Sequence, residues 1–263
     1  MKKVITMMLL SGLLVALGVS SANAQFNFLD DMESLPGGDI TQHGYTFVDL
    51  FRDANQTVNR TWLYNSASAP GKTFTSQVSD GLTNSAVFRT DEVLTSDTWM
   101  VSVEGTGSLN GSAEWIAGVI AAQDLALAGN GKLANGWAEL QWFNLPGNAR
   151  WLARTSNGIV DPIALPAYNV NNQEMQLAGK IDGSFDFTYD DGNGPTTVNH
   201  SFGGLDSTDM KKFGMTMASA SGGQMYTGEF DNLRATVIPE PGTLGLLAVA
   251  SLLVVAARRR KYT

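Results

Sequence analysis

Short runs in which hydrophobic and polar residues alternate dominate positions 25–237, and turn-forming residues separate the runs. A period of two is typical of strands that bury one face. The clearest strand candidates are Trp99–Glu104, Trp115–Ala121, Ala138–Phe143, Arg150–Arg154, Phe185–Tyr189, Phe213–Met217 and Gly228–Val237. Turn signals such as Asn110-Gly111, Pro146-Gly147-Asn148 and Asn157-Gly158 lie between them. The pattern predicts an all-β fold, an antiparallel β-sandwich or jelly roll.

The N-terminal end has a different pattern, in which charge is followed by an unbroken apolar run. Lys2 and Lys3 precede apolar residues 4–19, and Ala22-Asn23-Ala24 comes directly before Gln25. A basic start, an apolar middle and a small-residue A-x-A site are the three parts of a secretory signal. Residues 1–24 are therefore predicted to be a signal peptide. Signal peptidase is expected to bind the small side chains of Ala22 and Ala24 and to cleave before Gln25. The alternative is an N-terminal membrane anchor, for which the run is short.

The C-terminal end combines two prolines, an apolar run and a basic cluster. Pro239-Glu240-Pro241 precedes apolar residues 242–257, and the basic tail occupies 258–261. Fourteen to sixteen helical residues span only about 21–24 Å, less than the ~30 Å of a hydrocarbon core. We expect a short transmembrane helix with its basic tail in the cytoplasm, preceded by an extended strip that a protease can reach. The alternative is a permanent single-pass anchor.

In this order, the three C-terminal elements resemble the PEP-CTERM sorting signal. The resemblance covers residues 238–263 and is carried by Pro239, Glu240, Pro241, Arg258, Arg259 and Arg260. It implies that an exosortase, a membrane-embedded transpeptidase, recognises the signal and cleaves near the Pro-Glu-Pro motif. It also implies a Gram-negative host that makes exopolysaccharide, export through its inner membrane, and transient anchoring before release to the cell surface or the exterior.

Composition limits what the body between these signals does. The chain has 17 basic and 25 acidic residues, and six of the basic ones lie at the two ends, so 11 remain in the body and its charge is near −14. Such a surface repels nucleic acid. The chain has no cysteine, which excludes disulfides, thiolate metal sites and a cysteine nucleophile. We expect residues 25–237 to form a single domain.

A second resemblance involves the first and last strands of the body. Phe28-Leu29-Asp30-Asp31-Met32-Glu33 near the start, and Phe213–Met217 and Gly228–Thr236 near the end, look like the opening and closing strands of concanavalin A-like, laminin-G-type jelly rolls. The resemblance implies that these strands lie side by side, where several relatives hold a structural calcium. Asp31, Glu33 and Asp231 are then the candidate oxygen ligands. The alternative is that these acids cap turns or face solvent; no other cofactor is expected.

Residues with catalytic potential are sparse. His43 and His200 lie in no metal-binding or nucleophile motif, and no G-x-S-x-G elbow occurs. The strand that begins at Glu139 resembles the E-x-D-x-x-E strand of laminarinase-type glycosidases, but Gln141 and Asn144 replace its second and third acids. An amide serves neither as nucleophile nor as acid. We expect no catalytic residue, and an ordinary strand with Leu140 and Trp142 inward and Glu139 and Gln141 outward.

Six tryptophans are the most suggestive feature of the body. A Trp exposed beside amides stacks on the apolar face of a sugar ring. Trp137 and Trp151 stand at strand starts beside turns and are the candidates for such exposure. The leading hypothesis is a non-enzymatic surface or matrix protein associated with exopolysaccharide or biofilm. The alternatives are a lectin-like carbohydrate-binding module and a divergent glycosidase.

Overall fold

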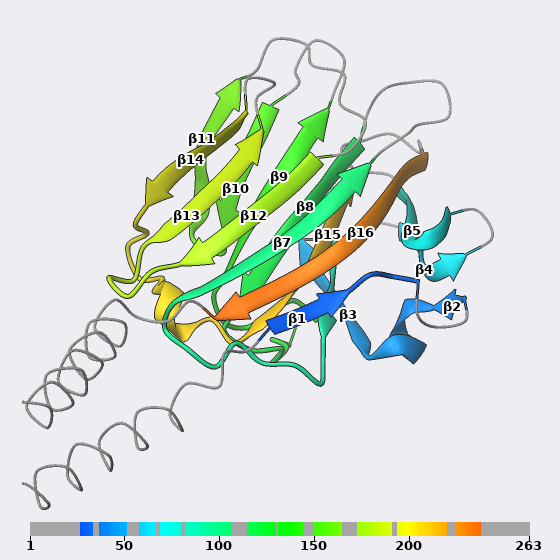
Figure 1. The fold of residues 1–263 in the computed structure, drawn as a ribbon, viewed down its shortest axis with the longest axis horizontal. Coiled ribbons are helices and arrows are strands. Elements are labelled where there is room, and N and C mark those ends of the chain that lie inside the picture. The colour runs from blue at the N-terminus through cyan, green and yellow to red at the C-terminus, as the bar shows by residue number, and fades with distance from the viewer. Residues whose placement is uncertain are drawn as a thin grey trace, which may run out of the picture.

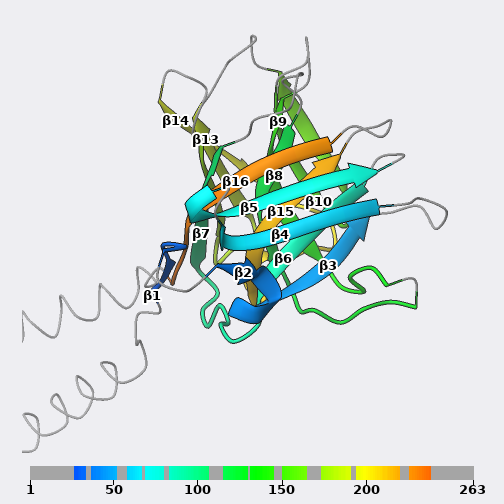
Figure 2. The ribbon, with the colours of Figure 1, turned by 90° about the vertical axis from the view of Figure 1, so that its right-hand side faces the viewer.

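Strands account for most of the described chain. The computed structural model describes residues 27–33, 37–51, 58–66, 69–79, 83–106, 115–129, 131–144, 150–164, 173–190, 194–219 and 225–237. In these ranges the helical elements are two short 3-10 helices, η1 (Ile40–His43) and η2 (Ser207–Asp209). Two antiparallel sheets lie as layers against each other (Figure 1, Figure 2), which confirms the predicted all-β sandwich. The predicted signal peptide 1–24 and the C-terminal helix 242–257 lie outside the described residues.

Nine strands form the first sheet. In spatial order they are β14 (Pro195–His200), β13 (Phe185–Asp190), β12 (Gln173–Gly179), β7 (Trp99–Thr106), β16 (Met225–Val237), β5 (Ala69–Ser79), β4 (Val58–Ser66) and β2 (Gly38–Asp39), with β1 (Asn27–Asp30) paired to β16. Asn27 lies opposite Thr236 in the β1–β16 pair. The first and last strands are therefore neighbours, as the jelly-roll resemblance implies.

Seven strands form the second sheet. In spatial order they are β11 (Gly158–Ala164), β10 (Arg150–Thr155), β9 (Trp137–Asn144), β8 (Trp115–Ala122), β15 (Lys212–Ser219), β6 (Thr83–Arg89) and β3 (Tyr45–Phe51). The β9–β10 hairpin places Arg154 opposite Glu139. The predicted Pro146-Gly147 turn lies midway between these two positions, so the hairpin register agrees with the turn expected from the sequence.

The main hydrophobic core fills the space between the two sheets. Alternate residues of β7 point into it, among them Trp99, Val101 and Val103. From the opposite sheet, β15 contributes Phe213 and Met215. Burying such side chains stabilises the fold by roughly 25 cal/mol per Å² of apolar surface, so this layer is the principal source of stability.

The outer face of the seven-stranded sheet carries a second, smaller core. The connection between β8 and β9 packs Leu125 and Leu133 against buried residues on this face, including Phe88, Ile120 and Trp137. Glu139 and Gln141 lie on this outward face, as expected, but both are fully buried there and do not face solvent. Strand periodicity places them opposite Leu140 and Trp142 correctly, but it does not reveal that the opposite face is buried too.

One further feature concerns membranes. Within the ranges that the structure describes, no helix is long and apolar enough to cross a bilayer.

Candidate functional site

A cluster of buried polar side chains crosses the outer face of the seven-stranded sheet. Glu139 on β9 is fully buried, and its carboxylate accepts hydrogen bonds from Nδ2 of Asn84 on β6 at 2.8 and 3.1 Å. Nε of Arg154 lies 3.6 Å from Glu139 Oε1. Nη1 of Arg154 donates to Oε1 of the buried Gln141 at 3.4 Å, and Gln141 Nε2 donates to Thr216 Oγ1 at 3.4 Å. These five residues are called the Glu139 cluster below.

A glycine leaves room for this cluster. Glu139 and Asn84 belong to strands that two others, β8 and β15, separate. Gly118 lies on β8 between them, and a Cβ there would lie 2.4 Å from the Leu140 carbonyl oxygen and 2.7 Å from Thr216 Oγ1. Because Gly118 has no side chain, the polar side chains of β9 can lie across β8. This explains how Glu139 on β9 reaches Asn84 on β6.

Burial determines the electrostatics of the cluster. Desolvation raises the pKa of Glu139 above its ordinary value of 4.5, while the charge of Arg154 and hydrogen bonds from Asn84 and Thr216 act in the opposite direction. A glycosidase of the type that this strand resembles needs a second carboxylate nearby. At the corresponding positions the sequence has Gln141 and Asn144. The Glu139 cluster therefore has one carboxylate, which accepts hydrogen bonds from Asn84 and lies next to Arg154.

A pocket of about 570 Å³ adjoins the cluster at one end of the sheet. Arg154 belongs to both the cluster and the pocket wall. The other polar side chains in the wall come from the β8–β9 connection, from the end of β10 and from the β10–β11 turn. They are Gln123, Lys132, Asn135, Thr155, Ser156 and Asn157. Such a mixture of amides, hydroxyls and cations suits a polar ligand.

The two tryptophans proposed for sugar contact are not exposed platforms. Trp151 is fully buried and packs against Trp142 with ring centroids 4.9 Å apart. Trp137 is 8% exposed because its ring belongs to the second core, although the side chain also lines the pocket. The expectation that they stand exposed is wrong, because β10 turns Trp151 toward the main core and the β8–β9 connection covers Trp137.

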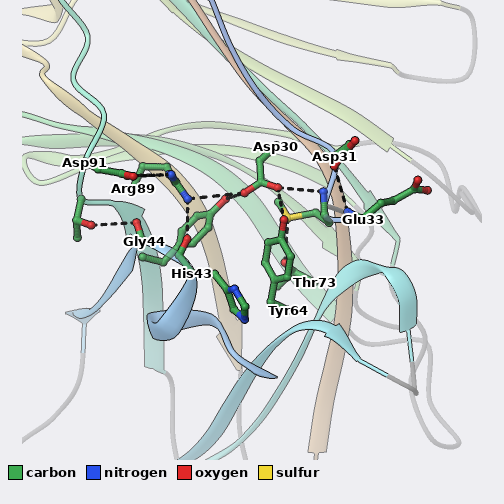
Figure 3. A network of polar contacts seen from close by, with 12 residues as sticks. Asp30, Asp31, Glu33, His43, Gly44, Tyr64, Thr73, Arg89 and Asp91 are labelled. Carbon is green, nitrogen blue, oxygen red and sulfur yellow. Dashed lines mark hydrogen bonds and ion pairs between the residues drawn. The ribbon is translucent and has the colours of Figure 1, made fainter. Parts of the chain in front are cut away.

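A second buried network joins the two sheets beside the first strand, as Figure 3 shows. Asp30 on β1 accepts hydrogen bonds from the Tyr64 hydroxyl at 2.5 Å and the Tyr45 hydroxyl at 2.9 Å. Its carboxylate also accepts from the Met32 backbone at 3.0 Å and lies 3.8 Å from Arg89 Nη1. Burial, followed by the charge of Asp30, raises the pKa of Tyr45 well above its ordinary value. All these contacts stay within the protein, so the network fastens β1 to β3, β4 and β6.

The calcium site expected at Asp31, Glu33 and Asp231, with backbone carbonyls completing the shell, stays a prediction. In the part of the chain that the structure describes, no group of three or more acidic or histidine side chains is arranged to hold a metal ion. Asp31 and Glu33 are exposed, and Asp31 Oδ1 instead accepts from the Glu33 backbone at 3.1 Å, as Figure 3 shows. Asp231 accepts from the Asn232 backbone at 2.7 Å. The acid that points inward here is Asp30, and protein donors already bind both its oxygens.

Burial also affects Asp231. Desolvation raises the pKa of its carboxyl, and the nearby charges of Glu104 and Glu33 add to the effect, against a hydrogen bond from Asn232 and the charge of Lys72. Glu104 lies directly opposite it on β7. The result is mutual repulsion of acids on the sheet.

Several of the important residues were not singled out from the sequence. Asp30 lies one position before the acid that was chosen, and alternation along β1 is the signal that separates the inward from the outward carboxylate. Arg154 is opposite Glu139, a pairing that a turn centred on Pro146-Gly147 implies. Lys132 and Asn157 lie in connections, and no sequence pattern marks them as neighbours.

Solved structures show what the fold is similar to. One is the CBM2 module of the evolved Dit of Lactobacillus casei BL23 phage J-1, with a TM-score of 0.53, 13% identity, and coverage of 81% of this chain and 97% of that chain. Another is a GH43 protein of Bacillus licheniformis, with a TM-score of 0.52 and 12% identity, where the match covers 80% of this chain and 39% of that one. Peanut lectin also matches, with a TM-score of 0.48, 14% identity, and coverage of 83% and 100%.

At these identities the likeness to solved structures concerns the fold alone, a two-sheet antiparallel sandwich. Among curated protein sequences, none matches the chain. The family comparison concerns the C-terminal end. Pro239, Glu240, Pro241 and Arg258 to Arg260 lie outside the described residues, directly after β16. Residues 237–261 match the PEP-CTERM protein-sorting motif, so this is an exported chain with a C-terminal sorting signal of the kind that exosortases process.

Proposed function

We propose that the chain is a non-enzymatic protein of the cell surface or extracellular matrix that associates with exopolysaccharide through its β-sandwich. The observation that carries the non-enzymatic part is the state of Glu139. Its carboxylate is fully buried, bound by Asn84 and next to Arg154, and the second acid that glycoside hydrolysis needs is replaced by an amide. Such a carboxylate has a structural role.

Delivery rests on the sorting motif. The motif begins at Val237, the last residue of β16, and Val237 is itself paired with Trp99 of β7. The Pro-Glu-Pro sequence therefore starts two residues beyond a folded strand. Cleavage there leaves the complete sandwich as the mature protein, released at the surface of a Gram-negative cell that makes exopolysaccharide.

A lectin-like role for the sandwich is the second candidate, and the pocket beside Arg154 favours it. Its wall carries amides and hydroxyls from two connections, groups that hydrogen-bond sugar hydroxyls. None of the described residues that line this pocket is Asp or Glu, so we expect sugar binding there to need no calcium.

A glycan array tests the proposal, with the full chain applied with and without EDTA and the same glycans checked afterwards for shortened products. The proposal expects binding to polysaccharide fragments, unchanged by EDTA, and no product. Hydrolysis that disappears in Glu139→Gln would identify a divergent glycosidase and contradict it. If no glycan binds, association with exopolysaccharide is contradicted, and only sorting to the cell surface remains of the proposal.

A further inference from the structure

We propose that the pocket beside Arg154 binds an acidic saccharide, with Lys132 and Arg154 as counter-charges for a sugar carboxylate. This inference rests on the proposed function, because it names the class of polysaccharide that the sandwich recognises. The ligand is a uronic acid unit within a polymer. Neutral sugars are the alternative that the experiment below separates from it.

The charge of the pocket differs from that of the chain. The formal net charge of the protein is −8. Among the described residues that line the pocket, Lys132 and Arg154 are basic, and none is Asp or Glu. The acids beside these two cations are already engaged: Glu139 accepts from Asn84, and Asp49, which forms an isolated β-bridge with Lys132, is paired with Arg60. Asp124 accepts from Asn135 of the wall at 2.6 Å. A concave site lined by one sign of charge attracts the opposite sign, here an anion.

Arg154 has donors to spare. Its side chain is 15% exposed, so it forms part of the pocket wall while reaching the buried cluster. A guanidinium has five N–H donors. The contact with Glu139 and the hydrogen bond to Gln141 involve Nε and Nη1. Donors therefore remain for a ligand carboxylate, which arginine binds with a geometry that matches its planar fork.

The amides of the wall are held in place for a sugar ring. Asn157 donates through Nδ2 to the Gly203 carbonyl at 3.0 Å, and Gln123 accepts from the Gly136 backbone at 2.9 Å. Gln123 also donates to Asp209 at 3.4 Å, so both ends of its amide are fixed by the protein. Asn157 is fixed through Nδ2, and its Oδ1 can meet a sugar hydroxyl. The pocket volume of about 570 Å³ is within the usual range for small-ligand sites. Trp137, Leu50, Leu133 and Leu205 supply the apolar part of the wall.

Glu139 competes with the ligand for Arg154. When Glu139 is ionised, its charge neutralises the guanidinium from the buried side, at 3.6 Å. Removing that charge leaves Arg154 free to face the pocket. Arg154 faces Glu139 on its buried side and shares the pocket wall with Lys132, which forms an isolated β-bridge with Asp49. Glu139→Gln is therefore expected to tighten binding of an anion, an effect that a purely structural role of Glu139 does not produce.

The test is titration calorimetry of the full chain with a galacturonate tetramer and, in parallel, a neutral galactose tetramer. The inference expects the acidic tetramer to bind and the neutral one to bind at least about tenfold more weakly, because a charge-assisted hydrogen bond contributes roughly 1.5–3 kcal/mol. Lys132→Gln should weaken binding of the acidic tetramer about threefold. Lys72 is a matched control, because it does not line the pocket and its Nζ lies 3.4 Å from a carboxylate oxygen of Glu229. Lys72→Gln makes the same charge change and should leave the affinity for the acidic tetramer unchanged.

Because Arg154→Gln alone leaves a buried carboxylate without its cation, the informative variant is the double change Glu139→Gln with Arg154→Gln. It should bind the acidic tetramer at least about tenfold more weakly than Glu139→Gln alone. Equal affinity for both tetramers, or full binding by the double variant, overturns the inference and leaves the proposed function intact. Binding of neither tetramer overturns the inference, and failure on the glycan array as well overturns association with polysaccharide.

Discussion

Glu139 is a fully buried acid with a raised pKa, and this makes stability depend on pH. The folded chain holds the proton of Glu139 more tightly than the unfolded chain, so the contribution of this group is complete below pH 4.5 and is lost as pH rises through the folded pKa. Glu139→Gln keeps an acceptor for Asn84 but does not ionise.

We therefore expect the unfolding free energy of Glu139→Gln, relative to the unchanged chain, to rise between pH 4 and pH 8. Urea unfolding across this range measures it. Parallel pH profiles for the two proteins would contradict the buried, ionisable state of Glu139.

Asp30 and Asp31 are adjacent in sequence and differ in role. Asp30 accepts from two tyrosines and faces Arg89, whereas Asp31 is exposed and accepts from the Glu33 backbone (Figure 3). Removing one partner of a buried charged network costs about 3–5 kcal/mol. Asp30→Asn should lower the unfolding free energy by about 3 kcal/mol, and Asp31→Asn by less than about 1 kcal/mol. Chemical denaturation of both variants checks this, and equal effects would refute the assignment of Asp30 as the inward residue.

At the scale of elements, side chains of β9 and β15 meet above β8 only because β8 has a glycine, Gly118, at that position. A methyl group at Gly118 would overlap the Leu140 carbonyl oxygen and Thr216, whereas nothing lies within 4 Å of one at Gly129 in the β8–β9 connection. Overpacking of this kind costs about 1–3 kcal/mol. Gly118→Ala should lower the melting temperature and disturb the Glu139 cluster, and Gly129→Ala should not. Thermal unfolding followed by circular dichroism distinguishes them.

Sequence periodicity predicted the positions of strands better than it predicted which of their side chains are buried. The seven predicted strands all lie in observed strands, from β7 to β16, because alternation and hairpin turns are local signals. The periodicity did not predict β2 to β6, β11, β12 or β14. In β5, polar residues such as Thr73 and Thr75 are buried and blur the alternation. The burial of Glu139 and Trp137 depends on a connection that folds back over the sheet, a long-range fact that no local pattern carries.

The pocket was missed for the same reason. Its wall combines the β8–β9 connection, the β10–β11 turn and Gly204, segments that are distant in sequence. The jelly-roll resemblance identified neighbouring strands correctly, and alternation along β1 determines that Asp30 points inward while Asp31 is exposed.

At the scale of the whole molecule, the two ends of the body meet. Asn27 lies opposite Thr236 in the antiparallel β1–β16 pair, so their Cα atoms are within disulfide reach, about 4.5–5.5 Å. The chain has no cysteine of its own. A variant with Asn27→Cys and Thr236→Cys should form an intramolecular disulfide, seen as faster migration on a non-reducing gel. The control pair Asn27→Cys and Glu174→Cys, on strands that are not neighbours, should stay reduced.

The central claim is that the sandwich is delivered by C-terminal sorting, and intact-mass spectrometry of protein recovered from its native host tests it most directly. The account predicts a mature species that begins at Gln25 and ends near Glu240. A variant with Pro239→Ala, Glu240→Ala and Pro241→Ala should keep its tail. An unaltered protein that is intact through Thr263 would mean a permanent membrane anchor and would contradict the account.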